Sequence, residues 1–382
     1  MNPRIGRMIQ IFSALLLAVV LAISPASTMA MPAEHPSPQP TPTPEIPAPP
    51  EIDSCAAVVY ETNTGRILYA KDAETQYYPA STTKILTALI AIERLELDEI
   101  IHFTDYSISC IADEARHFEL QPGEEMPLYS CLQALLIPSC NEAASSIAEH
   151  IAGSEEAFAE IMNERARQAG AVNSHFVYPH GLQDDTHYVT ATDMALILAD
   201  CVQYDVYREI SGSWECEILD AQDSTYYYDT HNALLRPDSD MNRDWVVCSK
   251  TGHTWYAGYA LMSYGVQDGM EVTCAVLGGS SYASVVEDTV RLCEYAFDTY
   301  RIYDSTAAAT VLIRNELGDC DVTLYQPKAL LTPEMPSKPV TSALGQMRYQ
   351  GYGEFEGNVI LTLPDGTQQD VWYTARVTDE GE

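Results

Sequence analysis

The sequence predicts an α+β fold in which helices flank an antiparallel sheet, followed by a small C-terminal β-sandwich domain. Strand-like segments stand at both ends of residues 51–304, and helical segments lie between them. This order is typical of one sheet built from both ends of a domain and covered by helices. From about residue 307 onward the sequence is β-like, with proline and glycine between short strands, so we expect a second domain over residues 305–382.

The N-terminus has the pattern of an export signal. Arg4 and Arg7 precede a mostly apolar run over residues 9–23, and residues 28–30 (Thr-Met-Ala) resemble a small-residue cleavage site. We therefore expect residues 1–30 to be a signal peptide and the protein to be exported. The alternative is an uncleaved N-terminal segment that holds the protein at the membrane. No amphipathic helix is visible at the C-terminus, so we expect no anchor there.

Residues 31–50 are nearly half proline. Such a segment forms an extended chain that cannot pack a core, and it predicts a linker ahead of the folded domain.

The composition limits the possible functions. The 382 residues carry a formal net charge of −35, which disfavours nucleic acid and anionic membrane surfaces as partners. Apolar residues make up 46% of the chain, enough for a sizeable core. All ten cysteines follow the predicted signal, and their even number is compatible with disulfides. Several lie in apolar runs, so we expect them to be small buried side chains.

The first half of the folded domain begins with a hairpin and continues with helices. Two strands are expected over residues 55–60 and 66–69, because Asn63-Thr64-Gly65 between them favours a turn. The apolar spacing after Ser81 predicts a buried helix up to about residue 97. Further helices are expected in three segments: residues 128–150 with a break at Pro138, residues 154–169, and residues 192–207.

The second half of the domain returns to strands. Residues 245–250, 255–264 and 271–277 are rich in β-branched and aromatic side chains, and Asp268-Gly269 favours a hairpin turn. A helix over residues 283–302 is expected to close the domain. In the C-terminal domain we expect strands over residues 309–314, 320–325, 358–363 and 371–377.

Three short motifs together describe one active site. They are Ser81-Thr82-Thr83-Lys84, Ser139-Cys140-Asn141 and Lys250-Thr251-Gly252. Each motif alone has an ordinary structural explanation, such as a helix cap, a turn after a proline or a strand end. Only five lysines occur in the chain, however, and two of them complete these motifs. The set predicts a serine acyl-transfer enzyme that acts on a peptide or a β-lactam.

The predicted catalytic residues are Ser81, Lys84 and Ser139. A hydroxyl is a poor nucleophile, so Ser81 needs a base, and the i, i+3 spacing places the Lys84 amine on the same helical face. Lysine acts as a base only when neutral, and burial lowers its pKa toward that state. Ser139 is placed to pass a proton to the leaving amine.

The predicted substrate-binding residues complete the site. The Asn141 amide can bond a substrate amide, and Lys250 with the Thr251 hydroxyl suits a substrate carboxylate. Gly252 leaves room for a peptide beside the strand. The backbone N–H groups of Ser81 and His253 are candidates for the two donors that an oxyanion needs.

These residues resemble the low-molecular-weight penicillin-binding proteins, specifically the serine-type D-alanyl-D-alanine carboxypeptidases. The resemblance covers about residues 51–302 and includes Pro179-His180-Gly181-Leu182 and the Ala257-Gly258-Tyr259 that follows the third motif. It implies a β-lactamase/transpeptidase-like fold and removal of the terminal D-alanine from peptidoglycan stem peptides through an acyl-enzyme. It also implies inhibition by β-lactam antibiotics and no cofactor.

Two groups of residues near the predicted site need a separate interpretation: the cysteine of the second motif and three histidines. Cys140 stands where the family usually has glycine, and we expect it to pack in the wall of the site. His175, His180 and His187, with Asp184 and Asp185 nearby, match no standard zinc spacing. We therefore expect loop structure there and no metal.

Two other functions remain open from the sequence. A serine β-lactamase needs a carboxylate to activate the deacylating water. Residues 165–183 contain no acid, which argues against this function. The second alternative is a penicillin-binding scaffold protein with little turnover.

Overall fold

The computed structural model describes residues 47–109, 120–220 and 225–304. In the C-terminal part it describes residues 312, 321–325, 329–333, 341–351, 354–362 and 368–378. The expected signal peptide and most of the expected linker lie outside these residues, as does most of the strand expected over 309–314. The domain boundaries at residues 30, 50 and 304 stay predictions.

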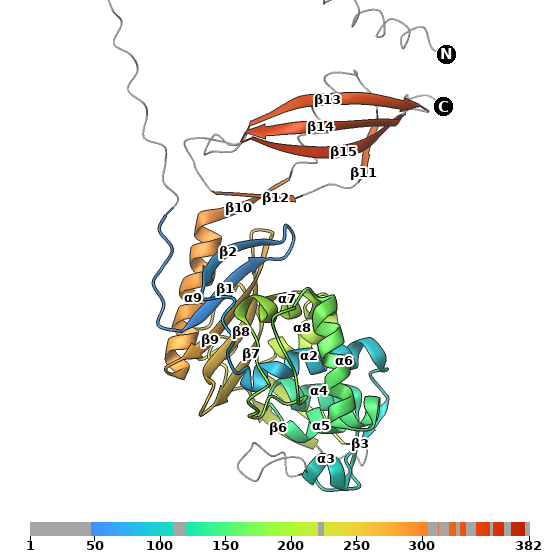
Figure 1. Cartoon of the computed structure of the whole chain (residues 1–382), viewed down its shortest axis with the longest axis vertical. Helices are drawn as coiled ribbons and strands as arrows, with labels where there is room; N and C mark the ends of the chain where they lie inside the picture. Colours follow the sequence, from blue (N-terminus) through green and yellow to red (C-terminus); the bar gives the residue numbers. More distant parts are fainter. Residues whose placement is uncertain are drawn as a thin grey trace, which may run out of the picture. The chain divides into compact units, whose positions relative to one another are not determined.

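The main sheet is antiparallel and contains both ends of the domain, as predicted (Figure 1). Its strand order is β2-β1-β9-β8-β7, so two strands from the start of the domain pair with three from its end. The strands are β1 (Ala56–Glu61), β2 (Arg66–Lys71), β7 (Val246–Thr254), β8 (Gly258–Gln267) and β9 (Met270–Gly279). The third sequence motif therefore lies on β7, a strand at the sheet edge.

The prediction that a strand begins at residue 255 was wrong. β7 continues to Thr254, and residues 255–257 form the turn into β8. The aromatic character of Trp255 and Tyr256 favours a strand. However, Gly258 has φ +66, and a Cβ there would lie 2.8 Å from the carbonyl oxygen of Gly279. The chain reverses before this glycine, and both aromatic side chains are left in the turn.

Helices cover both faces of the sheet (Figure 1). They are α2 (Lys84–Arg94), α3 (Asp105–Ser109), α4 (Leu128–Leu136), α5 (Asn141–Ala152), α6 (Glu155–Gln168), α7 (Ala191–Cys201), α8 (Asp205–Gly212) and α9 (Tyr282–Thr299). Side chains alternate across a strand. Thus in β1 Ala56 and Val58 join the core under α2, whereas Ala57 and Val59 join the core under α9.

Two predicted helices are each divided in the structure. The helix expected over residues 128–150 becomes α4 and α5, with the break around Pro138 as predicted. The helix expected over residues 192–207 begins one residue earlier, because the Thr190 side chain caps α7 by accepting from the Asp193 amide at 3.1 Å. It then ends at Cys201, and α8 follows.

Two short hairpins were not predicted. β3 (Ile100–His102) pairs with β4 (Glu125–Pro127), and β5 (Glu215–Leu219) pairs with β6 (Thr225–Asp229). β3 and β4 have only three residues each, too few for an alternation pattern to be recognised, whereas β5 alternates between exposed and buried residues and was overlooked.

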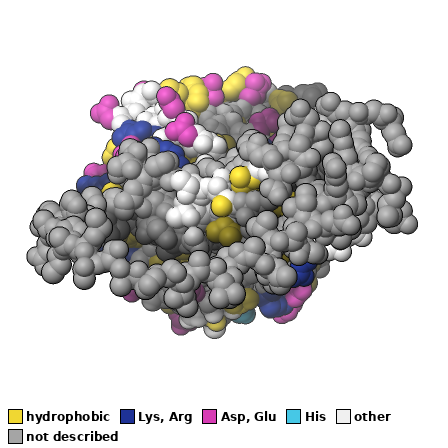
Figure 2. Space-filling model, turned by 90° about the horizontal axis from the view of Figure 1, so that it is seen from above, with side chains coloured by type: hydrophobic (Ala, Val, Ile, Leu, Met, Phe, Trp, Pro, Cys, Tyr) yellow, Lys and Arg dark blue, Asp and Glu magenta, His cyan; other side chains and the backbone are white. Residues whose placement is uncertain are grey.

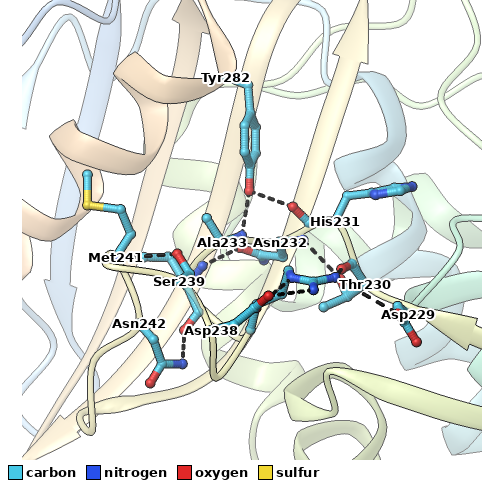
Figure 3. Close-up of polar contacts among 12 residues, drawn as sticks. Asp229, Thr230, His231, Asn232, Ala233, Asp238, Ser239, Met241, Asn242 and Tyr282 are labelled. Atoms are coloured by element: carbon cyan, nitrogen blue, oxygen red, sulfur yellow. Dashed lines mark hydrogen bonds and ion pairs between the residues drawn. The ribbon is translucent and has the colours of Figure 1, made fainter.

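The connection from β6 to β7 is held by side-chain hydrogen bonds (Figure 3). The Tyr282 hydroxyl at the start of α9 accepts from the Ala233 amide at 2.6 Å and donates to the His231 carbonyl at 2.9 Å. Asn232 accepts from the Leu234 amide, and the Asn242 side chain donates to the Leu234 carbonyl. These bonds fix the segment that leads into the strand carrying Lys250.

Strands β10–β15 form two small sheets, which agrees with the β-rich C-terminal prediction. β10 (Tyr300–Asp304) pairs with β12 (Ala329–Pro333). The second sheet has the order β11-β15-β14-β13, built from β11 (Asp321–Tyr325), β15 (Gln368–Thr378), β14 (Glu354–Thr362) and β13 (Thr341–Gly351). The sequence predicted β11, β14 and β15 but not the other three strands.

The charged surface and the burial of most described cysteines agree with what the composition predicted. Acidic side chains recur on the coloured part of the surface in Figure 2, with basic ones between them. Among the described cysteines, seven are buried thiols and Cys55 is exposed. None of the helices within the described ranges has the length and apolar character needed to cross a bilayer.

The Asp288 side chain on α9 binds the segment just before β1, and we expect this contact to stabilise the fold. Its buried carboxylate accepts from the Ser54 hydroxyl at 2.6 Å and from the Ser54 and Asp53 amides at 2.8 and 3.2 Å. We expect Asp288→Ala to lower the free energy of unfolding by about 2–3 kcal/mol, because buried donors lose a charged acceptor. Urea denaturation would measure this, with Asp298→Ala on the exposed side of α9 as the control. An equal change in both variants would contradict the prediction.

Candidate active site

The first motif places a serine and a lysine side by side on one turn. A 3-10 turn, η1 (Ala80–Thr83), precedes α2, so Ser81 lies on η1 and Lys84 opens the helix. Residues i and i+3 are nearly eclipsed in such a turn. The Lys84 Nζ consequently lies 3.1 Å from the Ser81 Oγ, as the spacing predicted.

The Lys84 amine has two further acceptors. Its Nζ donates to the Asn141 Oδ1 at 2.7 Å and to the His180 carbonyl at 2.9 Å. A neutral amine has two N–H bonds and one lone pair. If both N–H bonds point at these acceptors, the lone pair is directed to the Ser81 hydroxyl, which then donates to it.

Burial changes the protonation of Lys84. The side chain has no exposed surface, and this desolvation lowers the pKa of Lys84 to about 7. The Glu142 carboxylate opposes the shift by favouring the charged form, but burial is the larger effect. The lysine can therefore serve as a proton acceptor near neutral pH.

The backbone around Ser81 is tightly constrained. Ala80, directly before the serine, has φ 49, a left-handed conformation that costs a non-glycine residue of order 1–3 kcal/mol. Gly181 packs against it: a Cβ at Gly181 would lie 1.8 Å from the Ala80 carbonyl oxygen. Only glycine fits there, and the Pro-His-Gly-Leu segment thereby fixes the turn that presents Ser81.

The second and third motifs meet at another serine and lysine pair. The Lys250 Nζ donates to the Ser139 Oγ at 2.9 Å and to the Thr251 carbonyl at 2.9 Å. Ser139 follows Pro138 and has φ 67, a strained conformation that turns the chain into α5. Lys250 is 2% exposed, so its ammonium is held in the wall of the site.

Gly252 allows β7 to approach the nucleophile. A Cβ on Gly252 would lie 3.0 Å from the Pro79 carbonyl oxygen and 3.1 Å from the Thr82 amide nitrogen. The glycine thus brings the strand edge against η1, and the room for a peptide that the sequence suggested stays a prediction. Thr251 is partly exposed and His253 is exposed, with its ring 4.2 Å from the ring of Tyr259.

Cys140 lies in the wall of the site, as expected. It is 2% exposed, and its Sγ donates to a Glu142 carboxylate oxygen at 3.0 Å. Burial raises the pKa of the Cys140 thiol well above its ordinary value. A thiol in this state is a weak nucleophile.

Sequence reasoning missed the role of the segment around His180. The His180 carbonyl binds Lys84, and the Pro179 carbonyl accepts from the Thr87 hydroxyl at 2.6 Å. The buried His180 ring lies 3.4 Å from a Glu155 carboxylate oxygen. The Pro-His-Gly-Leu motif was the signal that could have indicated this contact.

The other two histidines of this loop, His175 and His187, also contact neighbouring groups of the fold. His187 is buried and lies 3.2 Å from the Thr83 hydroxyl, and burial lowers the pKa of His187 to about 3. His175 is exposed and contacts the Thr186 carbonyl through its Nδ1. Within the described residues, no group of histidine, cysteine or carboxylate side chains is arranged to hold a metal ion.

The arrangement links five of the predicted side chains (Ser81, Lys84, Asn141, Ser139 and Lys250) by hydrogen bonds, and Thr251, Gly252 and His253 lie on the same strand as Lys250. Four side chains form two hydrogen-bonded serine–lysine pairs, one with a lysine of lowered pKa. Asn141 joins the first pair, and β7 carries Thr251, Gly252 and His253 beside it. Such a site can activate a hydroxyl nucleophile, bind an anion at Lys250 and transfer a proton through the second serine.

Comparison with known proteins agrees with this geometry. D-alanyl-D-alanine carboxypeptidase DacF of Bacillus subtilis is 28% identical over 289 residues, covering 72% of this chain and 72% of the relative. DacA of Escherichia coli is 27% identical over 268 residues, covering 66% of this chain and 62% of the relative. The crystal structure of DacD from Francisella tularensis shares the fold, with a TM-score of 0.70 at 23% identity over 90% of this chain and 97% of that one.

The family comparison covers the part of the chain that carries the three motifs. The family described as D-alanyl-D-alanine carboxypeptidase matches residues 43–281, which is more than half of the sequence. This range includes Ser81, Ser139 and Lys250 together with the sheet and helices that position them. The chain therefore belongs to the D-alanyl-D-alanine carboxypeptidase family.

Proposed function

We propose that the protein hydrolyses the terminal D-alanyl-D-alanine bond of peptidoglycan stem peptides through a serine acyl-enzyme and is inhibited by β-lactams. The observation that carries this proposal is the presence of two serine–lysine pairs in one site, with distances of 3.1 and 2.9 Å. One pair suits a nucleophile with its base, and the other suits a proton relay beside a carboxylate-binding cation. Family membership supports the same reaction.

The first half of the reaction forms the acyl-enzyme. The Ser81 Oγ attacks the carbonyl carbon of the penultimate D-alanine while its proton moves to the neutral Lys84 Nζ. The backbone N–H groups of Ser81 and His253 stabilise the oxyanion. The C–N bond then breaks, and the leaving D-alanine amine takes the proton from Lys84 through Ser139, which leaves the Lys84 amine neutral again. In the second half, water attacks the ester carbonyl and Lys84 accepts its proton; the bond to the Ser81 Oγ then breaks, and Lys84 returns the proton to this oxygen.

Substrate recognition uses the β7 edge. The Lys250 ammonium and the Thr251 hydroxyl bind the terminal carboxylate, and Asn141 bonds a substrate amide. The partners are therefore peptidoglycan stem peptides and β-lactams, whose carboxylates occupy the same position. We further propose an extracytoplasmic location, supported by the signal-like N-terminus.

D-alanine release tests the proposed activity. We expect the protein to release D-alanine from diacetyl-Lys-D-Ala-D-Ala and to lose this activity after stoichiometric acylation by benzylpenicillin. Labelling by fluorescent penicillin without release from this peptide or from intact muropeptides would favour the scaffold alternative. Rapid turnover of nitrocefin would favour the β-lactamase alternative.

Lys250→Ala should impair recognition of the substrate carboxylate. We expect kcat/KM for a free-acid peptide to fall by about 10- to 100-fold, the value of one or two charge-assisted hydrogen bonds. The slow reaction of the corresponding C-terminal amide should change much less, because it has no carboxylate. Steady-state kinetics on both peptides would check this, and an equal loss on both would contradict the carboxylate role.

A further inference from the structure

Two exposed aromatic side chains stand at the end of the strand that carries the third motif. Trp255 is 90% exposed and Tyr256 is 70% exposed, and both lie in the turn from β7 to β8. We call this pair the aromatic turn. Two adjacent large apolar side chains exposed at the end of this strand offer a contact surface for a ligand. The reaction steps above make no use of it.

The aromatic turn is held firmly against β7. The Thr254 Oγ1 accepts from the Ala257 amide at 3.0 Å, which closes the turn. Gly258 has the positive φ that the return into β8 requires. The two strands then pair from Thr254 opposite Gly258 back to Lys250 opposite Met262. The aromatic side chains are thus carried by a hydrogen-bonded turn at the end of a paired hairpin.

The order of residues along β7 gives the direction of a bound peptide. Lys250 and Thr251 come first and suit the terminal carboxylate. Gly252 comes next and lies against η1, the turn that carries Ser81. A peptide with its carboxylate at Lys250 and its scissile bond at Ser81 therefore continues toward Thr254 and the aromatic turn.

The distance along β7 from Gly252 to the aromatic turn determines how many peptide residues are needed to reach the turn. A strand rises about 3.3 Å per residue, so Thr254 at the end of β7 lies roughly 7 Å beyond Gly252, and the aromatic turn begins at the next residue. An extended peptide reaches the turn with about three residues. A substrate with only two residues ends before the turn, whereas a tetrapeptide or pentapeptide reaches it.

We propose that the aromatic turn is a subsite for the acyl-donor peptide on the N-terminal side of the scissile bond, so that the enzyme selects peptides of four or more residues. This inference rests on the proposed function. Trp and Tyr suit the role because they offer large rigid contact surfaces at low cost in conformational entropy. Binding energy gained far from the reacting bond can be used to raise kcat/KM.

Peptide length tests the proposal. We expect kcat/KM of the unaltered protein to be about tenfold higher for a pentapeptide ending in D-Ala-D-Ala than for acetyl-D-Ala-D-Ala. In the double variant Trp255→Ala/Tyr256→Ala this gain should fall to about twofold or less, and in Trp255→Phe/Tyr256→Phe most of it should return. Trp372→Ala, which removes a half-exposed tryptophan from β15, is the matched control and should keep the full gain.

The outcomes separate this inference from the proposed function. If neither peptide releases D-alanine, the proposed function itself fails. If both peptides react but the gain is absent, or survives in the alanine variant, the subsite is refuted and the activity stands. An equal loss on both peptides and on penicillin acylation would assign the turn a structural role and also refute the subsite.

Discussion

Ser81→Ala should abolish both D-alanine release and covalent labelling by penicillin. The Ser81 hydroxyl is the only group of the two pairs that the Lys84 amine can activate directly, at 3.1 Å. Removing a catalytic serine from such a unit typically lowers kcat by a factor of about 10⁶, so residual release should be at background. Mass spectrometry of the penicillin-treated variant would show the unmodified mass.

The control for Ser81→Ala is a serine of the same type outside the site. Ser109→Ala, on the exposed end of α3, should keep full labelling and full D-alanine release. Folding of the Ser81 variant can be checked by its urea denaturation midpoint. Penicillin adducts that persist in a folded Ser81→Ala variant would show that another residue is the nucleophile.

Lys84 should control the pH dependence of acylation. Its pKa is lowered to about 7 by burial, so below pH 7 the amine is protonated and cannot accept the Ser81 proton. The second-order rate of penicillin acylation should therefore rise with pH, by about tenfold per pH unit below 7, and level off above it. Stopped-flow acylation between pH 5 and pH 9 would measure this profile.

Two substitutions distinguish whether Lys84 acts as a proton acceptor or only through its positive charge. Lys84→Met removes both, and Lys84→Arg keeps a cation that stays protonated in proteins. We expect both variants to acylate at least about 10²- to 10⁴-fold more slowly, the range ascribed to general base catalysis. Near-normal rates in Lys84→Arg would mean that position 84 acts only through its charge. A flat profile across pH 7 in the unaltered protein would likewise refute the base.

The fold was predictable where local patterns were long and regular. The apolar run after Ser81 and the paired strands at both ends of the domain gave the correct layers. Predictions failed where tertiary contacts overrode local preference. Trp255 favours a strand locally, yet the requirement for a turn before Gly258 placed it outside.

In the candidate site, too, the local contact was predictable from the sequence and the long-range contacts were not. The Ser81–Lys84 contact spans three residues and follows from the geometry of one helical turn. The contacts of Lys84 with Asn141 and His180 and of Lys250 with Ser139 span 57, 96 and 111 residues. Motif resemblance suggested that the three motifs meet, but no local pattern indicated which atoms pair.

The sequence alone therefore predicted the candidate reacting groups, their order along the chain and the α+β layers, because these depend on residue type and short-range spacing. Only the tertiary structure decided that the His180 carbonyl holds Lys84, that burial brings the Lys84 pKa to about 7, and that Trp255 and Tyr256 lie in the turn after β7. Desolvation and long-range hydrogen bonds arise from packing between distant segments, and residue spacing carries no measure of them.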